Sequence, residues 1–378
     1  MKKMSNKIAI VGAGNAGCLS ALECYFNREE ENEGVIGEIE IYHDPDIPIE
    51  RVGQGLQLNS SVTVFESLDM NWVDRNLIKA TVKQGINYEG WGNKNPNFFH
   101  PFGSGQVAAH YIPALLSQQT LRSGLFNVIE KKVTDIDSQV DADYVIDCRG
   151  TPKNLDGYEI LTNPINSVIL GTKSGKDPDL LYTRHVATPH GWTFIIPNHD
   201  SVSYGYLYNN KITSYDEARD DFLSRFDGVF LTGDLNFKNY VAKNLWVNER
   251  TLLNGNRYSF IEPLEATSSG VHIGIANRLY EVLLRQGSHS EVAEYAKKEV
   301  KKCQDFILWH YKSGSMYDTN FWRYARELEY SDEHALNKYI EQSKNAPRVL
   351  PVVDEDEEED MIFAQWGPHS FKVWYENT

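Results

Sequence analysis

Residues 7–24, KIAIVGAGNAGCLSALEC, constrain the fold of this chain more than any other segment. The apolar run IAIV predicts a short buried strand, and the Ala-, Leu- and Cys-rich end predicts a helix. Between them, Gly12, Gly14 and Gly17 match the pattern G-x-G-x-x-G. There the first glycine permits a sharp turn, the second lets a pyrophosphate approach the backbone, and the third lets the helix pack on the strand. The segment predicts an ADP-containing cofactor; a glycine turn that serves packing alone is the alternative.

The residues around this turn are the expected cofactor contacts. Asn15 and Ala16 begin the helix, whose free N–H groups and partial positive charge favour a phosphate. The next strand, EIEIYHDPD, should end near an acid that holds the ribose hydroxyls. His43 stands about where that acid belongs, and of the aspartates that follow, Asp44 and Asp46, we favour Asp44.

The charge of the chain argues against several classes of partner. Its 378 residues carry 37 Lys and Arg against 53 Asp and Glu, a formal net charge of −16. This acidity disfavours nucleic acids and anionic membranes as partners. No apolar run approaches the length of a membrane span, and the first residues lead into a strand rather than the core of a signal peptide. The four cysteines have no metal or redox spacing, so we expect reduced, mostly buried thiols in a cytoplasmic protein without a metal site.

Downstream segments predict more of a parallel sheet. A polar loop at 51–61 is followed by a predicted helix to about residue 85, and apolar spacing predicts another helix over 104–119. Residues 141–150, DADYVIDCRG, predict a strand that ends at a glycine. In flavoproteins with a two-dinucleotide-binding fold, such a strand returns to the sheet beside the cofactor, which favours FAD over a nicotinamide carrier. Any other buried parallel strand would look the same, and that alternative stays open.

The pattern changes after residue 180. Apolar and polar residues alternate in HGWTFIIP and SVSYGYLY, and the tight turn at 198–200 between them predicts an antiparallel hairpin in a second sheet. We expect a helix over 216–226, an extended segment and a long helix within 256–283, and helices to about residue 346. The acidic run at 354–360 is expected to be a solvated loop.

Two polar segments could carry chemistry. Lys83 lies in ATVKQGINYEGW, and Glu265 lies in FIEPLEATSSG, just before a predicted helix. Taken singly, they would be a surface lysine and a glutamate that interacts with a helix dipole. Thr267 and Ser268 would expose backbone N–H groups at that helix start, a seat for an anion.

Together, these segments resemble the motifs of the flavin-dependent halogenases of the tryptophan-halogenase type, in the same order. GAGNAG resembles the flavin loop, ATVKQGINYEGW the segment with the essential lysine, and HGWTFIIP the motif W-x-W-x-I-P. FIEPLEATSS resembles F-x-E-P-L-E-S-T, and residues 310–322 resemble a downstream helix and loop of the family. The resemblance extends from the N-terminus to about residue 325.

The resemblance implies an α/β fold of the two-dinucleotide-binding (GR2) type, with a parallel sheet, an antiparallel substrate-facing sheet and C-terminal helices. Residues 1–290 would form a discontinuous FAD-binding core, to which 155–230 contribute the substrate-facing sheet. Residues 291–378 would form a helical region that completes the substrate side.

The resemblance also implies roles for individual residues. Lys83 and Glu265 would be the catalytic pair, and the backbone of Thr267 and Ser268 would contact a halide. The flavin contacts would include Trp192 and Pro263, and the barrier between flavin and substrate would consist of Trp192, Phe194 and Pro197.

The implied reaction uses two separate sites. Reduced FAD from a separate flavin reductase would react with O2 and chloride, bromide or iodide to give hypohalous acid, which would cross an internal tunnel to Lys83. The lysine would polarise this acid or carry its halogen, and Glu265 would stabilise or deprotonate the attacked ring of an electron-rich aromatic substrate. Whether the chain forms a homo-oligomer stays open.

Several positions depart from the family pattern. Gln54 replaces a glutamate, Leu56 a threonine, Ala266 a serine and Phe194 a tryptophan. Much of the C-terminal region that closes over indole in tryptophan-directed members would also be absent. We therefore expect a more open site and a small aromatic substrate other than free tryptophan.

Two other functions remain open. A related FAD-dependent monooxygenase would hydroxylate an aromatic substrate, but that class usually has a late Gly-Asp motif where this chain has FIEPLEATSS. A non-catalytic flavin-binding protein is the other alternative, because Gln54, Ala266 and Phe194 differ from the family's residues.

Overall fold

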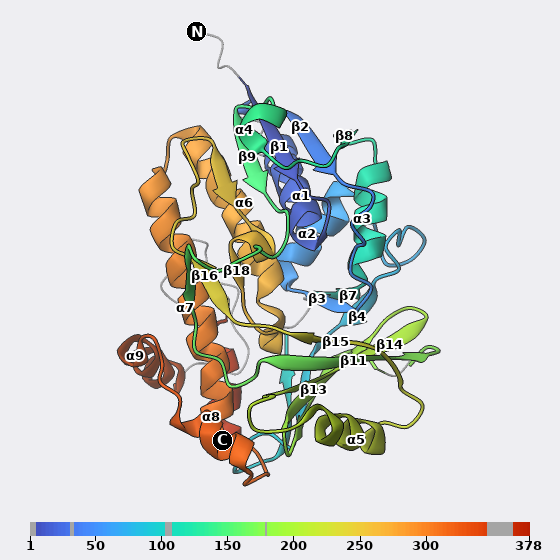
Figure 1. The fold of residues 1–378 in the computed structure, drawn as a ribbon, viewed down its shortest axis with the longest axis vertical. Helices are drawn as coiled ribbons and strands as arrows, with labels where there is room; N and C mark the ends of the chain where they lie inside the picture. Colours follow the sequence, from blue (N-terminus) through green and yellow to red (C-terminus); the bar gives the residue numbers. More distant parts are fainter. Residues whose placement is uncertain (1–4, 31–33, 103–107, 178–179, 346–365) are drawn as a thin grey trace.

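The computed structural model describes residues 5–30, 34–102, 108–177, 180–345 and 366–378 (Figure 1). The acidic run at 354–360 lies outside the described residues. Figure 1 shows a first sheet at one end of the molecule, a second sheet at the other, and helix α7 (His289–Ser313) along the side between them.

The first sheet is parallel and surrounds the N-terminal strand. Its five strands run in the order β17-β9-β1-β2-β8, and every neighbouring pair is parallel. Helix α1 (Asn15–Glu30) follows the central strand directly. The strands are β1 (Asn6–Val11), β2 (Ile36–His43), β8 (Asn127–Glu130), β9 (Tyr144–Asp147) and β17 (Thr251–Leu253). The predicted strands in 7–24, 38–46 and 141–150 are thereby confirmed, and β9 lies beside β1 as expected.

The second sheet has seven strands in the order β15-β11-β14-β13-β12-β5-β6. Neighbouring strands are antiparallel except β12 and β5, which are parallel. The strands are β5 (Gly85–Glu89), β6 (Asn97–Pro101), β11 (Ser167–Ser174), β12 (Thr183–Thr188), β13 (Gly191–Pro197), β14 (Ser201–Tyr208) and β15 (Phe230–Asn236). The hairpin predicted from HGWTFIIP and SVSYGYLY is confirmed as β13 and β14. Helix α5 (Tyr215–Arg225), also predicted, buries Ala218 and Phe222 against Tyr204 and Tyr206 of this sheet.

The remaining strands form two small sheets. One has the order β3-β7-β4 and contains β3 (Gln54–Leu56), β7 (Ala108–Tyr111) and β4 (Thr81–Lys83). The other has the order β10-β16-β18 and contains β10 (Tyr158–Ile160), β16 (Tyr240–Ala242) and β18 (Ser259–Phe260).

The helix predicted to extend to about residue 85 is wrong beyond Ser67. Helix α2 (Leu58–Ser67) ends because Asp69 takes a left-handed φ of 49°, and the Asn71 side chain then accepts the N–H groups of residues 73, 74 and 75 in a local turn. The chain continues into β4, so Lys83 lies on a strand.

The helix predicted over 104–119 is also wrong at its start. Strand β7 occupies 108–111, and helix α3 (Pro113–Arg122) begins only at its proline. Proline has no N–H to donate and disfavours helical backbone before it, so it serves as a first helical residue and not as an interior one. Residues 103–107 lie outside the described part of the chain.

The predicted extended segment and helices after residue 256 are confirmed. Short turns η1 (Gly255–Arg257) and η2 (Leu264–Ala266) flank β18 and precede the long helix α6. The helices are α6 (Ser268–Leu284), α7, α8 (Asn320–Glu327), α9 (Glu333–Ser343) and α11 (Pro368–Asn377), and a four-residue helix α4 (Ile136–Gln139) lies earlier in the chain. Helix α11 packs against α9 and β6, which brings the end of the chain to the second sheet.

The four cysteines are buried, as expected from their spacing. All four are free thiols. Within the described ranges, none of the helices combines the length and the apolar character needed to cross a membrane. The division at residues 155, 230 and 290 stays a prediction.

Candidate active site

The three glycines of the loop between β1 and α1 have different surroundings. A Cβ on Gly12, whose φ is 111°, would lie 2.5 Å from the carbonyl oxygen of Cys148, and one on Gly17 would collide with the Gly12 carbonyl. These two glycines are required for packing. A Cβ on Gly14 would meet no atom within 4 Å. The space in front of Gly14 and the N-terminus of α1 therefore fit the pyrophosphate of FAD.

A chain of side-chain hydrogen bonds joins this loop to β3. Asn15 donates to Oε1 of Gln54 at 2.9 Å, and the Tyr111 hydroxyl donates to Oδ1 of Asn15 at 2.5 Å. Gln54 in turn donates to Glu50 at 2.8 Å. The residue that departs from the family pattern, Gln54, thus fixes the position of β3 relative to the predicted cofactor loop.

Asp44 lies just beyond β2, at the same edge of the sheet as the glycine loop, since the Gly12 N–H donates to the carbonyl of Tyr42. Its Oδ1 accepts the backbone N–H of Asp46 at 3.1 Å, and its Oδ2 lies 3.4 Å from Nζ of Lys132. This position suits a contact with the ribose. The role of Asp44 stays a prediction.

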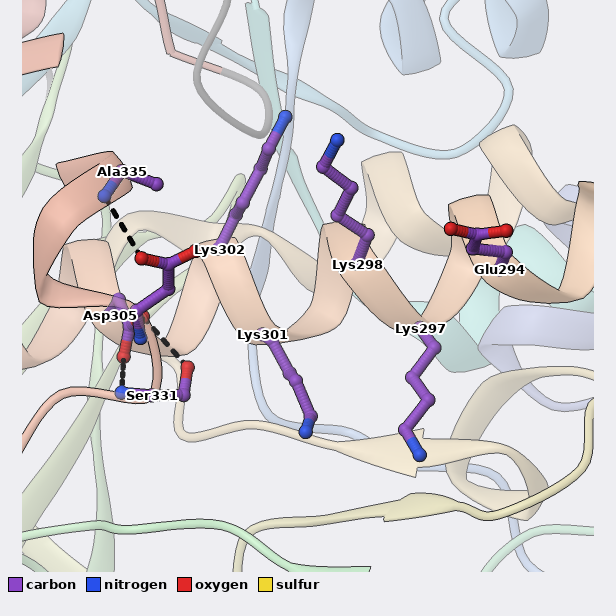
Figure 2. A pocket seen from close by; sticks show the side chains of 9 residues that line it. Glu294, Lys297, Lys298, Lys301, Lys302, Asp305, Ser331 and Ala335 are labelled. Atoms are coloured by element: carbon purple, nitrogen blue, oxygen red, sulfur yellow. Dashed lines mark hydrogen bonds between the residues drawn. The ribbon is translucent and has the colours of Figure 1, made fainter. Parts of the chain in front are cut away.

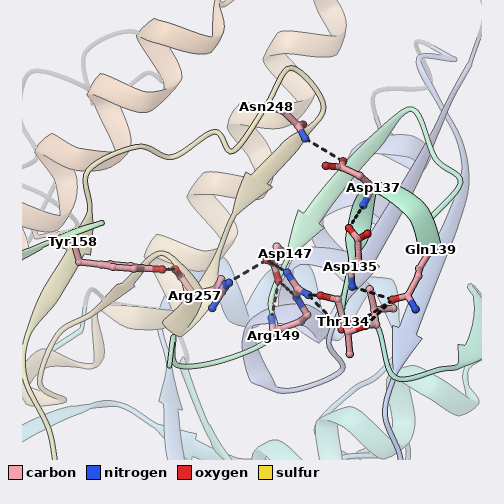
Figure 3. Close-up of polar contacts among 10 residues, drawn as sticks. Thr134, Asp135, Asp137, Gln139, Asp147, Arg149, Tyr158, Asn248 and Arg257 are labelled. Atoms are coloured by element: carbon pink, nitrogen blue, oxygen red, sulfur yellow. Dashed lines mark hydrogen bonds and ion pairs between the residues drawn. The ribbon is translucent and has the colours of Figure 1, made fainter. Parts of the chain in front are cut away.

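Ion pairs fix the end of β9 beside the glycine loop (Figure 3). Asp147, the last residue of β9, pairs with Arg149 at 2.8 Å and lies 3.4 Å from Arg257. Arg149 also donates to the carbonyls of Val133 and Thr134. These contacts hold the β9 end, and with it the Cys148 carbonyl that packs against Gly12, in place.

Lys83 is buried in the interior, with 2% of its surface exposed. Its Nζ lies 5.3 Å from the ring centre of Phe102, and a Cβ on Gly55 would lie 2.8 Å from that nitrogen and 3.5 Å from the Cβ of Ala266. The ammonium is therefore held between β3 and the turn that carries Glu265. Burial lowers the pKa of Lys83 to about 8, although Glu265 acts in the opposite direction.

Glu265 stands on a strained turn. Pro263 immediately precedes η2, and Glu265 and the following Ala266 have φ values of 74° and 54°, a left-handed backbone that residues with a Cβ disfavour. Each such residue costs on the order of 1 kcal/mol or more and persists only where its surroundings enforce it. The surroundings here are strand β3, which contacts η2, and helix α6, which begins two residues after Ala266.

The two oxygens of the buried Glu265 carboxylate have different partners. Oε1 accepts the hydroxyl of Tyr88 and lies 2.7 Å from Nε2 of His310. Oε2 is buried and has no hydrogen-bond partner among the described residues. Tyr88 and His310 were not predicted as site residues, although Tyr88 lies in ATVKQGINYEGW and His310 begins the 310–322 motif.

The start of α6 is the place where a halide seat was predicted. Thr267 is the residue before the helix and makes no side-chain cap, and Ser268 is the first helical residue. The hydroxyls of Thr267 and Ser269 are buried and without hydrogen-bond partners among the described residues. A 17-residue helix that begins without a cap leaves its first N–H groups able to bind an anion.

The three predicted barrier residues lie on β13 and are buried. Trp192 donates its indole N–H to the hydroxyl of Tyr311 at 2.7 Å, and its ring lies 6.2 Å from that of Phe194. The carbonyl of Pro197 accepts the hydroxyl of Thr81 at 2.7 Å, which ties β13 to the strand of Lys83. Burial raises the pKa of nearby Glu262 to about 8, with Tyr311, the Leu264 backbone and Trp192 opposing the shift.

The expectation of an open site is wrong for the described residues. Lys83 and Glu265 are both buried, and helix α11 covers their neighbours. The ring of Trp374 lies 3.8 Å from that of His310 and 4.7 Å from that of Tyr88. Aromatic residues near the end of the chain thus close this side of the site.

A pocket on α7 lies outside this site (Figure 2). Figure 2 shows Lys298 and Lys302 on one side of the helix and Lys297 and Lys301 on the other. The latter two pair with Glu159 at 3.1 and 2.6 Å. One carboxylate thus pairs with both of these lysines, and the pocket contains none of the predicted site residues.

Known proteins share both the sequence pattern and the fold. The sequence profile of the tryptophan halogenase family matches residues 7–123 and 117–365. Tryptophan 7-halogenase KtzQ of Kutzneria sp. (strain 744) is 27% identical over 194 residues, which cover 49% of this chain and 35% of that protein. Tryptophan 7-halogenase RebH of Lentzea aerocolonigenes is 26% identical over 214 residues, 51% of this chain and 39% of that protein. The match thus spans little more than a third of the length of these relatives.

Two solved structures extend the likeness over nearly the whole chain. Xcc4156, a flavin-dependent halogenase from Xanthomonas campestris, superimposes with a TM-score of 0.78 at 19% identity, covering 99% of this chain and 90% of that one. BrvH, a flavin-dependent halogenase from Brevundimonas sp. BAL3, superimposes with a TM-score of 0.77 at 19% identity, covering 100% of this chain and 90% of that one. They show that this chain has the α/β fold of flavin-dependent halogenases, as the sequence motifs predicted. Because the family profile covers most of its length, this chain belongs to the tryptophan halogenase family.

Proposed function

We propose that this protein is a flavin-dependent halogenase that replaces a hydrogen on an electron-rich aromatic carbon by a halogen, with Lys83 and Glu265 as the catalytic pair. One observation above all supports this proposal. A lysine and a glutamate from distant parts of the chain are buried around Gly55 and Ala266, and the glutamate keeps one oxygen without a partner among the described residues.

The residues present fit FAD. Gly14, Asn15 and Ala16 would hold the pyrophosphate at the start of α1, Asp44 would hold the ribose, and Pro263 and Trp192 would line the flavin. When bound in its reduced form, FAD supplies hypohalous acid from O2 and a halide. In the proposed architecture the FAD-binding core lies within residues 1–290, and residues 291–378 complete the substrate side.

Lys83 activates the hypohalous acid. Its ammonium donates a hydrogen bond to the oxygen of the acid while an aromatic carbon attacks the halogen. As the bond between oxygen and halogen breaks, the lysine gives a proton to the departing hydroxide, which leaves as water. A pKa near 8 makes this ammonium a better proton donor than an exposed lysine at neutral pH.

Glu265 completes the substitution. After halogen addition, the ring carbon carries both the halogen and a hydrogen, and Oε2 of Glu265 accepts that hydrogen as a proton. The proton then returns to the neutral amine of Lys83, which restores both side chains. The sum of the two steps is one aromatic hydrogen replaced by halogen and one water formed.

The other predicted site residues would hold the halide and separate the flavin from the aromatic substrate. The backbone of Thr267 and Ser268 would hold chloride, bromide or iodide at the start of α6. Trp192, Phe194 and Pro197 would keep the flavin apart from the substrate, so hypohalous acid would reach Lys83 through an internal tunnel. The partners of this reaction would be a separate flavin reductase and a small aromatic substrate other than free tryptophan.

The test supplies reduced FAD, O2 and bromide with a panel of phenols and indoles, and detects bromine in the product by its isotope doublet. Lys83→Ala and Glu265→Gln should abolish bromination while FAD still binds. Lys211→Ala, at an exposed lysine, is the matched control. A hydroxylated product without bromine would support the monooxygenase alternative instead, and FAD binding without any product would support the binding protein.

A further inference from the structure

The environment of Glu265 suggests a role for a residue that would not touch the substrate. This inference rests on the proposed function, in which Oε2 of Glu265 accepts the proton from the ring. A carboxylate can act in this way only if it is ionised and if the correct oxygen faces the substrate. One residue in hydrogen-bond contact with this carboxylate, His310, is placed to influence both properties.

The hydrogen bonds of His310 indicate which of its ring nitrogens carry protons. Its Nδ1 lies 2.7 Å from the carbonyl oxygen of Phe306, which can only accept, so Nδ1 carries a hydrogen. Its Nε2 lies 2.7 Å from Oε1 of Glu265. Two bare acceptors would repel each other there, so one proton must lie between Nε2 and Oε1. With a carboxylate on Glu265, His310 is an imidazolium that donates from both nitrogens.

The orientation of the His310 ring is fixed from both sides. Its side chain is fully buried on α7, with the ring of Trp374 at 3.8 Å and that of Phe306 at 4.5 Å. The Tyr88 hydroxyl donates to the same Oε1 atom. Two donors on Oε1 leave Oε2 as the oxygen that can take a proton from another molecule.

The other titratable groups around His310 and Glu265 do not supply a positively charged donor to Oε1 of Glu265. Lys83 on β4 and Glu265 on η2 are the reacting groups, and Tyr88 on β5 donates to Glu265. His100 on β6 and His185 on β12 are buried, and burial lowers their pKa values well below the usual range, so they are neutral. His369 on α11 faces His100, at 5.8 Å between rings.

We propose that His310 is a positioning residue for the halogenation reaction. As an imidazolium it binds Oε1, supplies the counter-charge that a buried carboxylate needs, and leaves Oε2 of Glu265 to accept the proton from the ring.

The test compares His310→Gln, which retains an N–H donor without the charge, with His310→Leu, which retains neither. Hypohalous acid formed without substrate is measured beside the pH profile of substrate halogenation. Both variants should form hypohalous acid at the wild-type rate. His310→Leu should lose on the order of 100-fold in kcat with KM little changed, because His310 does not touch the substrate. In His310→Gln the acid limb of the kcat profile should move to higher pH, because the donor that remains at Oε1 carries no charge.

Three results would overturn the inference. One is an unchanged kcat in both variants, and another is a uniform loss in His310→Gln with an unmoved acid limb, the result of a merely structural role. The third is loss of hypohalous acid formation together with halogenation. His334→Gln, at an exposed histidine, is the control, and FAD binding reports whether each variant is folded. Failure of the proposed function itself would appear separately, as wild-type protein that forms no hypohalous acid.

Discussion

The Nζ atom of Lys83 lies 2.8 Å from the point where a Cβ on Gly55 would stand. The preceding residue, Gln54, accepts a hydrogen bond from Asn15 in the predicted cofactor loop. Strand β3 therefore contacts the predicted cofactor loop through Gln54 and Lys83 through Gly55. The absence of a side chain at Gly55 leaves room for the ammonium beside Ala266.

Gly55→Ala should separate formation of hypohalous acid from its use. The new methyl group would meet the end of a flexible lysine, which can move, so the fold should tolerate the change. The displaced ammonium would no longer be aligned with Glu265, and halogenation kcat should fall by about 10- to 100-fold. Hypohalous acid production and FAD affinity should remain at wild-type values. Gly157→Ala is the control, because a Cβ there meets nothing within 4 Å; a wild-type kcat in Gly55→Ala would contradict the assigned position of Lys83.

Gly14→Val should remove FAD binding without unfolding the protein. A side chain at this position enters empty space in the protein and would occupy the place of the pyrophosphate. Flavin titration should show loss of binding, while the unfolding midpoint of the cofactor-free protein stays close to wild type. Gly17→Val provides the contrast, because a side chain there collides with the Gly12 carbonyl and should prevent folding. Normal FAD binding by Gly14→Val would place the cofactor elsewhere.

Lys83→Met should abolish halogenation and stabilise the fold. Burial lowers the pKa of this lysine from 10.5 to about 8. This shift lowers the free energy of unfolding by about 3 kcal/mol at neutral pH. Between these two values the unfolded chain binds more protons than the folded one, so wild-type stability rises with pH through this window. Urea unfolding should show the variant about 3 kcal/mol more stable at pH 7, with the difference shrinking above pH 8. Lys211→Met, at an exposed lysine, should show neither effect.

The elements with strong local signals were predictable from the sequence. The apolar run before Gly12 and the alternating residues of β13 and β14 form the strands that their patterns indicate. The errors at β4 and β7 have a common cause. Each strand is only three or four residues long and is stabilised by pairing within the β3-β7-β4 sheet, so no local pattern distinguishes it from a helix.

The site was predictable only in part, for a related reason. Lys83 and Glu265 could be proposed because each lies in a motif, although their roles still await the tests above. The contacts of Glu265 with Tyr88 and His310 join three distant segments, and no spacing along the chain reveals them. The closure by Trp374 depends on α11 returning to β6, which the composition of the C-terminal region does not indicate.

Ala266→Gly should stabilise the protein while leaving halogenation active. Ala266 has a φ of 54°, where a residue with a side chain is strained and glycine is not. The strain relieved in the folded state should exceed the conformational entropy that glycine adds to the unfolded chain. We expect a gain of about 1 kcal/mol in the free energy of unfolding, measured with urea. Ala276→Gly is the matched control, because Ala276 is buried in the interior of α6 and the same change should cost about 1 kcal/mol or more there. Destabilisation by both substitutions would show that the turn around Glu265 does not store backbone strain.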